Sequence, residues 1–432
     1  MKTFSFSINM NPITIATMGK GIPGMLRRAG TIQQRYGLTP KQMDRTLSHF
    51  VSLLDNYQCG ATFPITTSIL TRSRGIVEKY QAQRIEFAVH GYYHTDQTQL
   101  SFEEQLEHSA AARELFEQRG IRCEGFRSPY LRFNPMTLAA VKQAGFSYDS
   151  SQALAWDIPK EMETPAYRRA LDFYGAVSAS AYPALPRWDN GLVRIPYCLP
   201  DDEAFVDRFH TTPVRMTELW STILQRTHAQ GELFTVAIHP ERIVFCEQAL
   251  GQVLDQARQL QPHVWMTQLY QIADWWKART QSKIGITADG NELTVQVTGP
   301  EGVTLLARNV QVSSAARSWD KTWLEAEGAQ VKFHAERRPF IGVSPTSPAY
   351  LASFLRQQGY IVETTTDGAH SSFYLDRSHF VYEDERPLLD EIEQGDFPLV
   401  RLGRWPHGAR SALCVTGDID ALTLWDYALR IF

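Results

Sequence analysis

The sequence predicts an α/β protein with a parallel sheet or barrel, and two patterns carry that prediction. Residues 1 to about 280 alternate strand-like apolar runs with helix-like stretches. Four short polar motifs each follow directly on an apolar run of strand character. Because α/β barrels keep their chemistry just past the carboxyl ends of the strands, we expect these motifs to meet at one end. They are His90-Gly-Tyr-Tyr-His94, Arg127-Ser-Pro-Tyr130, Ile238-His239-Pro240 and Thr416-Gly-Asp418-Ile-Asp420.

Each expected element of this region has a local signal. Apolar residues at helical spacing predict a helix over residues 43–57. Ser101 with Glu104 three residues later predicts a capping box at the start of a helix. Gly145 is expected to end the helix over residues 136–144. The expected helices cover residues 43–57, 102–118, 136–144 and 216–228, and the expected strands cover 61–63, 87–89, 125–126, 146–148 and 234–238.

The pattern changes near residue 281. Residues 284–287 and 293–297 alternate with the two-residue period of a strand, around an Asp-Gly-Asn turn. Residues 340–363 predict a β-α-β fragment, residues 405–408 a turn, and residues 412–415 a final strand between two parallel neighbours. A helix from Ala421, which includes Trp425, is expected to cover the outside of that strand. We therefore divide the chain into a barrel over residues 1–280, an inserted β-rich and β-α-β module over 281–400, and a C-terminal strand and helix over 401–432 that complete the barrel.

Composition narrows the class of protein. The chain has 432 residues, is 43% hydrophobic and carries a formal net charge of -4, so nothing favours nucleic acid or an anionic membrane as partner. Five scattered cysteines lack zinc-ligand spacing, which favours core thiols in a reducing compartment. We find no apolar stretch of signal-peptide or membrane-span length. The expectation is a soluble, cytoplasmic protein.

The first two motifs each allow a functional and a structural interpretation. His90 and His94 could converge on one ion if the loop between them turns back, or they could be packing histidines in a tyrosine-rich loop. Pro129 makes a rigid turn, and Arg127 could hold a carboxylate in a bidentate fork. The structural alternative for that motif is an ordinary surface turn.

The last two motifs allow the same choice. A lone histidine such as His239 at a strand end is more often structural than catalytic. Asp418 and Asp420 flank one residue at a strand end, and two carboxylates that close need a counter-charge. A metal ion together with Arg127 would supply it. The alternative is that Asp420 is the N-cap of a helix that starts at Ala421.

Taken together, the four motifs resemble the polysaccharide deacetylase family, the carbohydrate esterase group that includes chitin and peptidoglycan deacetylases. The resemblance covers about residues 40–275 and 405–432, and leaves out the module between them. Residues 125–130 followed by 145–151 are especially typical. The resemblance implies a distorted (β/α) TIM-like barrel that binds a divalent metal through one aspartate and two histidines.

One departure from the family pattern leads to a further prediction. The family carries its aspartate motif on the first strand, where this chain has Asn9 and Asn11. An amide cannot act as a general base and is a poor zinc ligand. The missing motif follows residues 405–410 at the other end of the chain, so we infer a circular permutation. Alternatives are a vestigial second copy beside an inactive barrel, or a strand exchanged within a homodimer.

The resemblance implies a role for each residue of the metal site. Asp420, His90 and His94 would bind the ion, most naturally zinc, with cobalt, nickel, manganese or iron as alternatives. Asp418 would be the general base that takes a proton from water. Arg127 would orient Asp418 and hold its pKa down.

The remaining site residues would act on the substrate. His239 would protonate the leaving group, and the backbone N–H of Tyr130 would bind the oxyanion. Pro129, Asp149 and Trp156 are the candidate substrate-binding residues. The implied reaction is hydrolysis of an acyl group, first of all an N-acetyl group, on a carbohydrate. Two alternatives stay open: a hydrolase of non-sugar C–N bonds of the ureide or formamide type, acting on a small acyl-amide, and a catalytically inactive homologue that binds carbohydrate.

Overall fold

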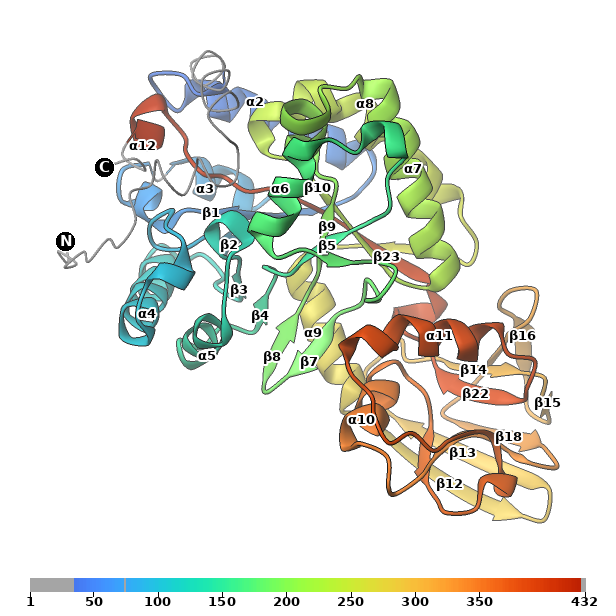
Figure 1. The fold of residues 1–432 in the computed structure, drawn as a ribbon. Helices are drawn as coiled ribbons and strands as arrows, with labels where there is room; N and C mark the ends of the chain where they lie inside the picture. Colours follow the sequence, from blue (N-terminus) through green and yellow to red (C-terminus); the bar gives the residue numbers. More distant parts are fainter. Residues whose placement is uncertain (1–34, 74, 429–432) are drawn as a thin grey trace.

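The computed structural model describes residues 35–73 and 75–428, and its main feature is a curled sheet with strand order β10-β23-β1-β2-β3-β4-β8-β7 (Figure 1). β11 pairs with β23 beside this path. All the pairs in the sheet are parallel except β7 with β8. The strands are β1 (Ala61–Ile65), β2 (Ile85–Val89), β3 (Gly125–Phe126), β4 (Tyr148–Asp149), β7 (Arg187–Asp189), β8 (Leu192–Arg194), β10 (Leu233–Ala237), β11 (Val264–Met266) and β23 (Ser411–Thr416).

The last strand of the chain is an interior strand of this sheet. β23 pairs in parallel with β10 on one side and with β1 on the other, and Val415 lies opposite both Val236 and Ala61. All six of its residues are buried, which explains the unbroken apolar run of residues 412–415. The prediction that this segment has parallel neighbours on both sides is confirmed, and Figure 1 shows the strand in red among strands from much earlier in the chain.

The side chain of Thr235 on β10 links the two ends of the curled sheet, which gives a distorted barrel. β4 runs on into β5 (Ala153–Ala155) and β8 into β9 (Tyr197–Leu199), and β5 pairs with both β9 and β6 (Val177–Ser178). β9 meets β10 through Thr235, whose Oγ1 donates a hydrogen bond to Pro196 O at 3.0 Å and accepts one from Cys198 N at 2.8 Å. The predicted α/β class with a distorted barrel is confirmed.

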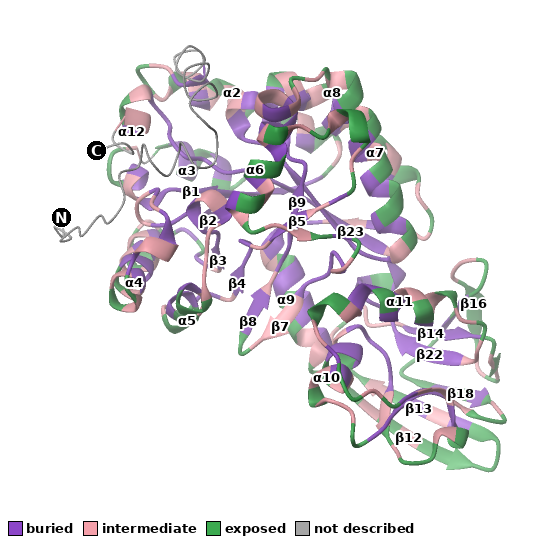
Figure 2. Ribbon diagram, in the orientation of Figure 1, coloured by how far each residue is buried: buried purple, intermediate pink, exposed green. Residues whose placement is uncertain are grey.

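Helices cover the outside of the barrel, and their inner faces and the strands are buried (Figure 2). Ser101 and Glu104 form the predicted capping box. The strand expected at residues 146–148 begins only at Tyr148, because Gly145 at φ +89° ends the preceding helix in a left-handed turn. The helices are α2 (Lys41–Asn56), α3 (Gly75–Gln81), α4 (Phe102–Gln118), α5 (Pro135–Gln143), α6 (Pro165–Tyr174), α7 (Pro213–Gln230), α8 (Ile243–Gln259) and α9 (Leu269–Thr280).

The inserted module holds three small sheets. The first is antiparallel, with β12 (Lys283–Asp289), β13 (Glu292–Thr298), β18 (Gln330–His334) and β15 (Gln311–Val312). The second is antiparallel too, with β16 (Ala316–Ser318), β17 (Leu324–Ala326), β14 (Leu305–Arg308) and β22 (Leu399–Leu402). The third is parallel, with β20 (Val362–Thr364), β19 (Arg338–Val343) and β21 (Ser371–Leu375), and the helices are α10 (Ala349–Gln357) and α11 (Glu385–Gln394).

Tryptophans join this module to the barrel. Trp405 is fully buried, its indole N–H donates to Gly231 O at 3.0 Å, and its ring lies against Trp265 and Trp276. The chain then makes the predicted turn, seen as a short helical turn over Pro406–Gly408, and enters β23. The path from module to barrel is therefore anchored immediately before the strand that completes the sheet.

The C-terminal helix differs from its prediction. α12 (Leu424–Ala428) begins three residues later than expected, because Thr423 and Asp426 cap each other: Asp426 N donates to Thr423 Oγ1 at 3.1 Å and Thr423 N to Asp426 Oδ2 at 3.1 Å. Trp425 is 65% exposed, so the expectation that it covers β23 is wrong. Asn9, Asn11 and the strand expected around them lie outside the described residues. No described helix has the length and apolar character needed to cross a membrane.

Candidate functional site

Two histidines and one aspartate meet at the carboxyl ends of the barrel strands. His90 and His94 follow β2, and Asp420 follows β23, with β1 between those strands. Asp420 Oδ1 lies 3.4 Å from His90 Nε2 and 3.2 Å from His94 Nε2. All three side chains are buried, and their ligand atoms lie within 4.8 Å of one another. The barrel thus brings together the three residues predicted to bind a metal.

The chemistry of this group fits a divalent ion. His90 Nδ1 lies 3.0 Å from Arg127 O, which fixes the ring so that Nε2 points toward Asp420. Anchoring of the second ring nitrogen by a carbonyl is the usual support of a metal-binding histidine. Two imidazoles and one carboxylate are a donor set of catalytic zinc sites. The alternative in which Asp420 caps a helix is wrong, since Thr423 and Asp426 cap α12.

Asp418 lies beside this group and is held by a fully buried arginine. Arg127 Nη1 donates to Asp418 Oδ1 at 2.7 Å, and Asp418 Oδ2 lies 3.7 Å from His90 Nε2. Ser150 fixes the guanidinium by accepting from Nε and Nη2, each at 3.0 Å. Burial acts to raise the pKa of Asp418, but His90 and Arg127 outweigh it and hold that pKa below its ordinary value. Asp418 is therefore kept as a carboxylate.

His239 approaches the aspartates because Gly417 has no side chain. A Cβ added at Gly417 would lie 1.7 Å from Ile238 O and 3.2 Å from His239 N, so only glycine permits the ends of β10 and β23 to come this close. His239 is 8% exposed, and its Nδ1 lies 2.8 Å from Asp202 Oδ1.

Asp202 controls the charge of that histidine. Burial acts to lower the pKa of His239, but the Asp202 carboxylate outweighs it and the pKa rises to about 10. Arg242 Nε lies 3.5 Å from the other Asp202 oxygen. Sequence reasoning missed Asp202, although it follows the strand-like Tyr197-Cys-Leu199 in the same way as the other site residues follow their strands.

Hydrogen bonds with residues at and just after the end of β4 hold the loop that follows β3 in place. Ser128 N donates to Ser151 Oγ at 2.9 Å, and Ser151 Oγ donates to Asp149, which also pairs with Arg194 at 3.0 Å. Asp149 is fully buried and supports the loop, and its predicted contact with a substrate stays a prediction. Tyr130 has φ +60°, and its ring lies edge-on to His94 with the centroids 4.5 Å apart.

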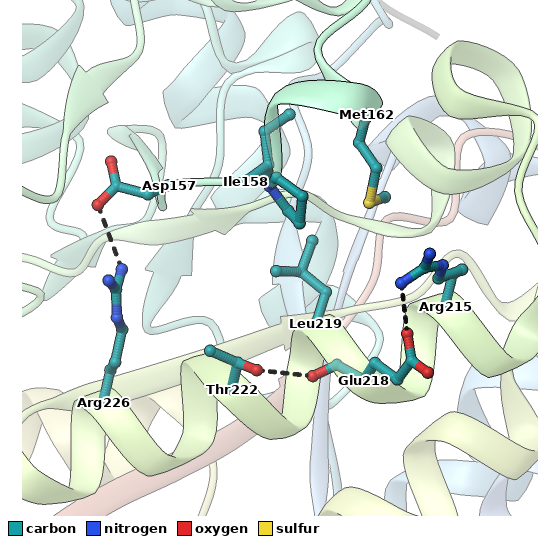
Figure 3. A pocket seen from close by; sticks show the side chains of 9 residues that line it. Asp157, Ile158, Met162, Arg215, Glu218, Leu219, Thr222 and Arg226 are labelled. Atoms are coloured by element: carbon teal, nitrogen blue, oxygen red, sulfur yellow. Dashed lines mark hydrogen bonds and ion pairs between the residues drawn. The ribbon is translucent and has the colours of Figure 1, made fainter.

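The other two predicted substrate residues are buried as well. Pro129 lies against the histidine loop: a Cβ added at Gly91 would meet Pro129 Cγ at 3.0 Å. Trp156 is 4% exposed and precedes a surface hollow of about 390 Å³ between Asp157–Met162 and α7. Figure 3 shows this hollow, where Asp157 pairs with Arg226 at 3.2 Å. None of the predicted site residues lines it.

The sequence of the barrel's first half resembles a known family. Residues 38–148 match the family model described as polysaccharide deacetylase. The resemblance inferred from the motifs is confirmed, and the matched segment contains His90, His94 and Arg127 but ends before His239 and the two aspartates. The circular permutation stays a prediction.

Several solved structures are similar to this chain at low sequence identity. A polysaccharide deacetylase described as putative, from Mycobacterium smegmatis, is 21% identical with a TM-score of 0.44, over 60% of this chain and 86% of that one. A family 4 carbohydrate esterase from Streptomyces lividans is 15% identical with a TM-score of 0.23, over 36% and 72%. An allantoinase is 20% identical with a TM-score of 0.42, over 54% and 72%. A comparison with proteins of curated function returned no match.

Proposed function

We propose that this polysaccharide deacetylase relative is a metal-dependent hydrolase that removes an N-acetyl group from a carbohydrate. One observation carries the proposal: a His-His-Asp group, a charged aspartate held by an arginine, and a histidine charged by a second aspartate meet at one end of the barrel. Metal-dependent hydrolysis of an amide uses these three parts, which are an ion site, a base and an acid.

His90, His94 and Asp420 would hold the ion. Their donor set suits zinc, and cobalt, nickel, manganese or iron are compatible with it. When bound, a divalent ion would supply Lewis acidity toward the carbonyl and the attacking water. The ion would also neutralise the buried aspartate pair, of which Arg127 alone balances one charge.

Asp418 and His239 would move the protons. Asp418 stays ionised at neutral pH and is oriented through Arg127 and Ser150, so it would take the proton from water. His239 is held protonated by Asp202 and would give its proton to the departing amine. The backbone N–H of Tyr130, on a loop that packs against His94, would bind the oxyanion.

The aspartate pair would act within one chain. In support, β23 of the same chain lies between β10 and β1, and Asp420 follows it to the two histidines. This arrangement is what a circular permutation of the barrel would produce, with the first strand supplied by the C-terminus. A homodimer is not needed to complete the site.

Acetate release from chitooligosaccharides tests the proposal. The enzyme with metal added should release acetate, and the Asp418→Asn and His94→Ala variants should lose this activity. His370→Ala is the matched control, because His370 is 75% exposed in the inserted module, and it should keep full activity. A formamide and cyclic-ureide panel is run beside the sugars. Hydrolysis of the panel alone would contradict the carbohydrate substrate, and oligosaccharide binding without any hydrolysis would contradict the enzyme proposal.

A further inference from the structure

A second cavity lies where the inserted module meets the opposite end of the barrel. It has a volume of about 310 Å³, and we call it the junction cavity. Glu232, which precedes β10, and Arg410, which precedes β23, line it from the barrel. Residues of β22, of α11 and of the loop between β16 and β17 line it from the module. The candidate active site lies at the opposite ends of β10 and β23, so the junction cavity is separate from it.

Buried arginines are in excess around the junction cavity. Arg279, Arg308, Arg401 and Arg404 are each at most 4% exposed, and the Nε atom of each has no hydrogen-bond partner in the described part of the chain. Arg401 and Arg404 line the cavity and share one carboxylate: Glu393 Oε1 lies 3.6 Å from Arg401 Nε and 3.2 Å from Arg404 Nη2. Buried charges are normally paired and fully hydrogen-bonded.

The other acidic groups that line the cavity are Glu232, Asp320 and Asp390, and the first two already pair with other arginines. Arg386 donates to both carboxylate oxygens of Glu232, and Asp320 pairs with Arg410 at 2.6 Å. Residues 1–34, 74 and 429–432 contain no aspartate or glutamate that could supply a partner. Burial, together with the charges of Arg404 and Arg401, lowers the pKa of Arg279 to about 9. Arg279 and Arg308 form no ion pair with a described residue, and Arg401 and Arg404 share one carboxylate, so the buried arginines outnumber the carboxylates that pair with them.

Two tryptophans and one aspartate also line the junction cavity. Trp323 is 4% exposed, and the guanidinium of Arg401 lies 4.7 Å from its ring centre. The Trp319 indole N–H donates to Gly408 O at 2.7 Å, which fixes a second aromatic ring in the wall. Asp390 also lines the cavity, forms no ion pair with a described residue, and has its pKa raised by burial.

We propose that the junction cavity binds a sugar-sized organic anion, a monosaccharide that carries a phosphate or a carboxylate. The anionic group would pair with the guanidinium groups of Arg401 and Arg404, which line the cavity and whose Nε atoms have no hydrogen-bond partner in the described part of the chain. The sugar ring would lie against the indoles, and its hydroxyl groups would donate to Asp390. A volume of about 310 Å³ is at the small end of ligand pockets and suits one sugar ring.

Calorimetric titration of the full-length protein tests this proposal with four probes: glucose 6-phosphate, glucuronate, glucose and inorganic phosphate. At least one of the two anionic sugars should bind and change the tryptophan fluorescence, and glucose should not. Which of the two binds more tightly distinguishes a phosphate from a carboxylate site. No binding of either anionic sugar would overturn the proposal, and so would inorganic phosphate that binds as tightly as glucose 6-phosphate.

Arg401→Gln locates the binding. It should weaken the anionic sugar at least tenfold and leave the melting temperature of the free protein unchanged or raised, because it removes an unbalanced buried charge. Arg377→Gln is the matched control: Arg377 is a half-exposed arginine that pairs with Glu391 of α11 at 2.9 Å, outside the cavity. Equal weakening in both variants, or unchanged binding in Arg401→Gln, would place the ligand elsewhere. Acetate release is not part of this test, so its outcome is independent of the proposed hydrolase function.

Discussion

The two ends of strands β10 and β23 hold buried charge of opposite sign. At the carboxyl ends, Asp418 and Asp420 lie together and Arg127 neutralises one of them. At the amino ends, Arg401 and Arg404 share the single carboxylate of Glu393. A buried charge without a full partner is costly, so a ligand of the opposite charge would stabilise each end.

The difference between the ends lies in how the charge is held. The acidic end is built from residues just past strand ends, where neighbouring parallel strands bring their motifs together. The basic end is built where a separate module docks on the barrel, and its arginines come from β14, α9 and the segment of β22 that leads into Trp405. A site at strand ends leaves a pattern in the sequence, whereas a site between two units does not.

Removal of the last strand is expected to have the largest effect on folding. It would test whether the acidic and the basic end both depend on β23. A fragment of residues 1–404 lacks β23, which is buried on both sides between β10 and β1. Its loss opens the barrel and exposes two sheet edges, so the fragment should be insoluble or partly unfolded. Solubility and a thermal melt measure this. A soluble fragment that melts cooperatively and retains metal would contradict the completed-barrel account and favour a vestigial copy.

Gly417→Ala should separate the two ends. Its Cβ would lie 1.7 Å from Ile238 O, so β10 and β23 must move apart beside His239 and Asp418. We expect acetate release to fall by orders of magnitude and stability to fall by about 1–3 kcal/mol, as for other overpacked sites. Binding at the junction cavity should persist.

Gly251→Ala, on the buried-to-surface boundary of α8, is the control for Gly417→Ala. Its added Cβ would meet Tyr57 Oη at 3.6 Å, an ordinary contact, and alanine favours a helix. Steady-state kinetics and thermal melts should show it close to wild type. A Gly417→Ala protein with unchanged activity would contradict the close approach of the two strand ends.

Asp418→Asn should remove the base but keep the ligands of the ion. The substitution preserves shape and can still accept from Arg127, so metal content should stay at the wild-type level. The turnover number should fall by about 10²–10⁴-fold, the usual contribution of general base catalysis. Kinetics and elemental analysis on the same sample measure both. Near-normal turnover would show that the assignment of the base is wrong.

Asp202→Asn should shift the pH dependence rather than abolish activity. The Asp202 carboxylate raises the pKa of His239 to about 10, and the protonated histidine is the form that donates to the leaving group. Loss of the carboxylate lowers that pKa, so the alkaline limb of the turnover number should move to lower pH. Activity at acidic pH should change least. A limb that stays in place would mean that His239 does not set it.

The acidic end could largely be predicted from the sequence, for a physical reason. His90, His94, Asp418 and Asp420 interrupt apolar runs at strand ends, and that contrast is visible without a structure. Asp202 was missed because the strand before it, Tyr197–Leu199, has only three residues and lies between Pro196 and Pro200, so its pattern is weak.

The basic end could not be predicted in this way. Arg401 lies within the strand Leu399–Leu402 and looks like a single charge in an apolar run. Arg401 gains its surroundings from Trp323, Arg404 and Glu393, which the folding of the module brings near it. The exposed Trp425 shows the same limit: side-chain pattern suggested a covering helix, but local capping by Thr423 and Asp426 delays the helix and turns that residue outward.

Metal content is the measurement that tests the central claim most directly. Elemental analysis of the purified protein should give about one divalent ion per chain, as expected for a site of two histidines and one aspartate. His94→Ala and Asp420→Ala should each lose this ion, and His370→Ala should retain it. Equal metal in the wild type, His94→Ala and Asp420→Ala would contradict the claim that these residues form a metal site.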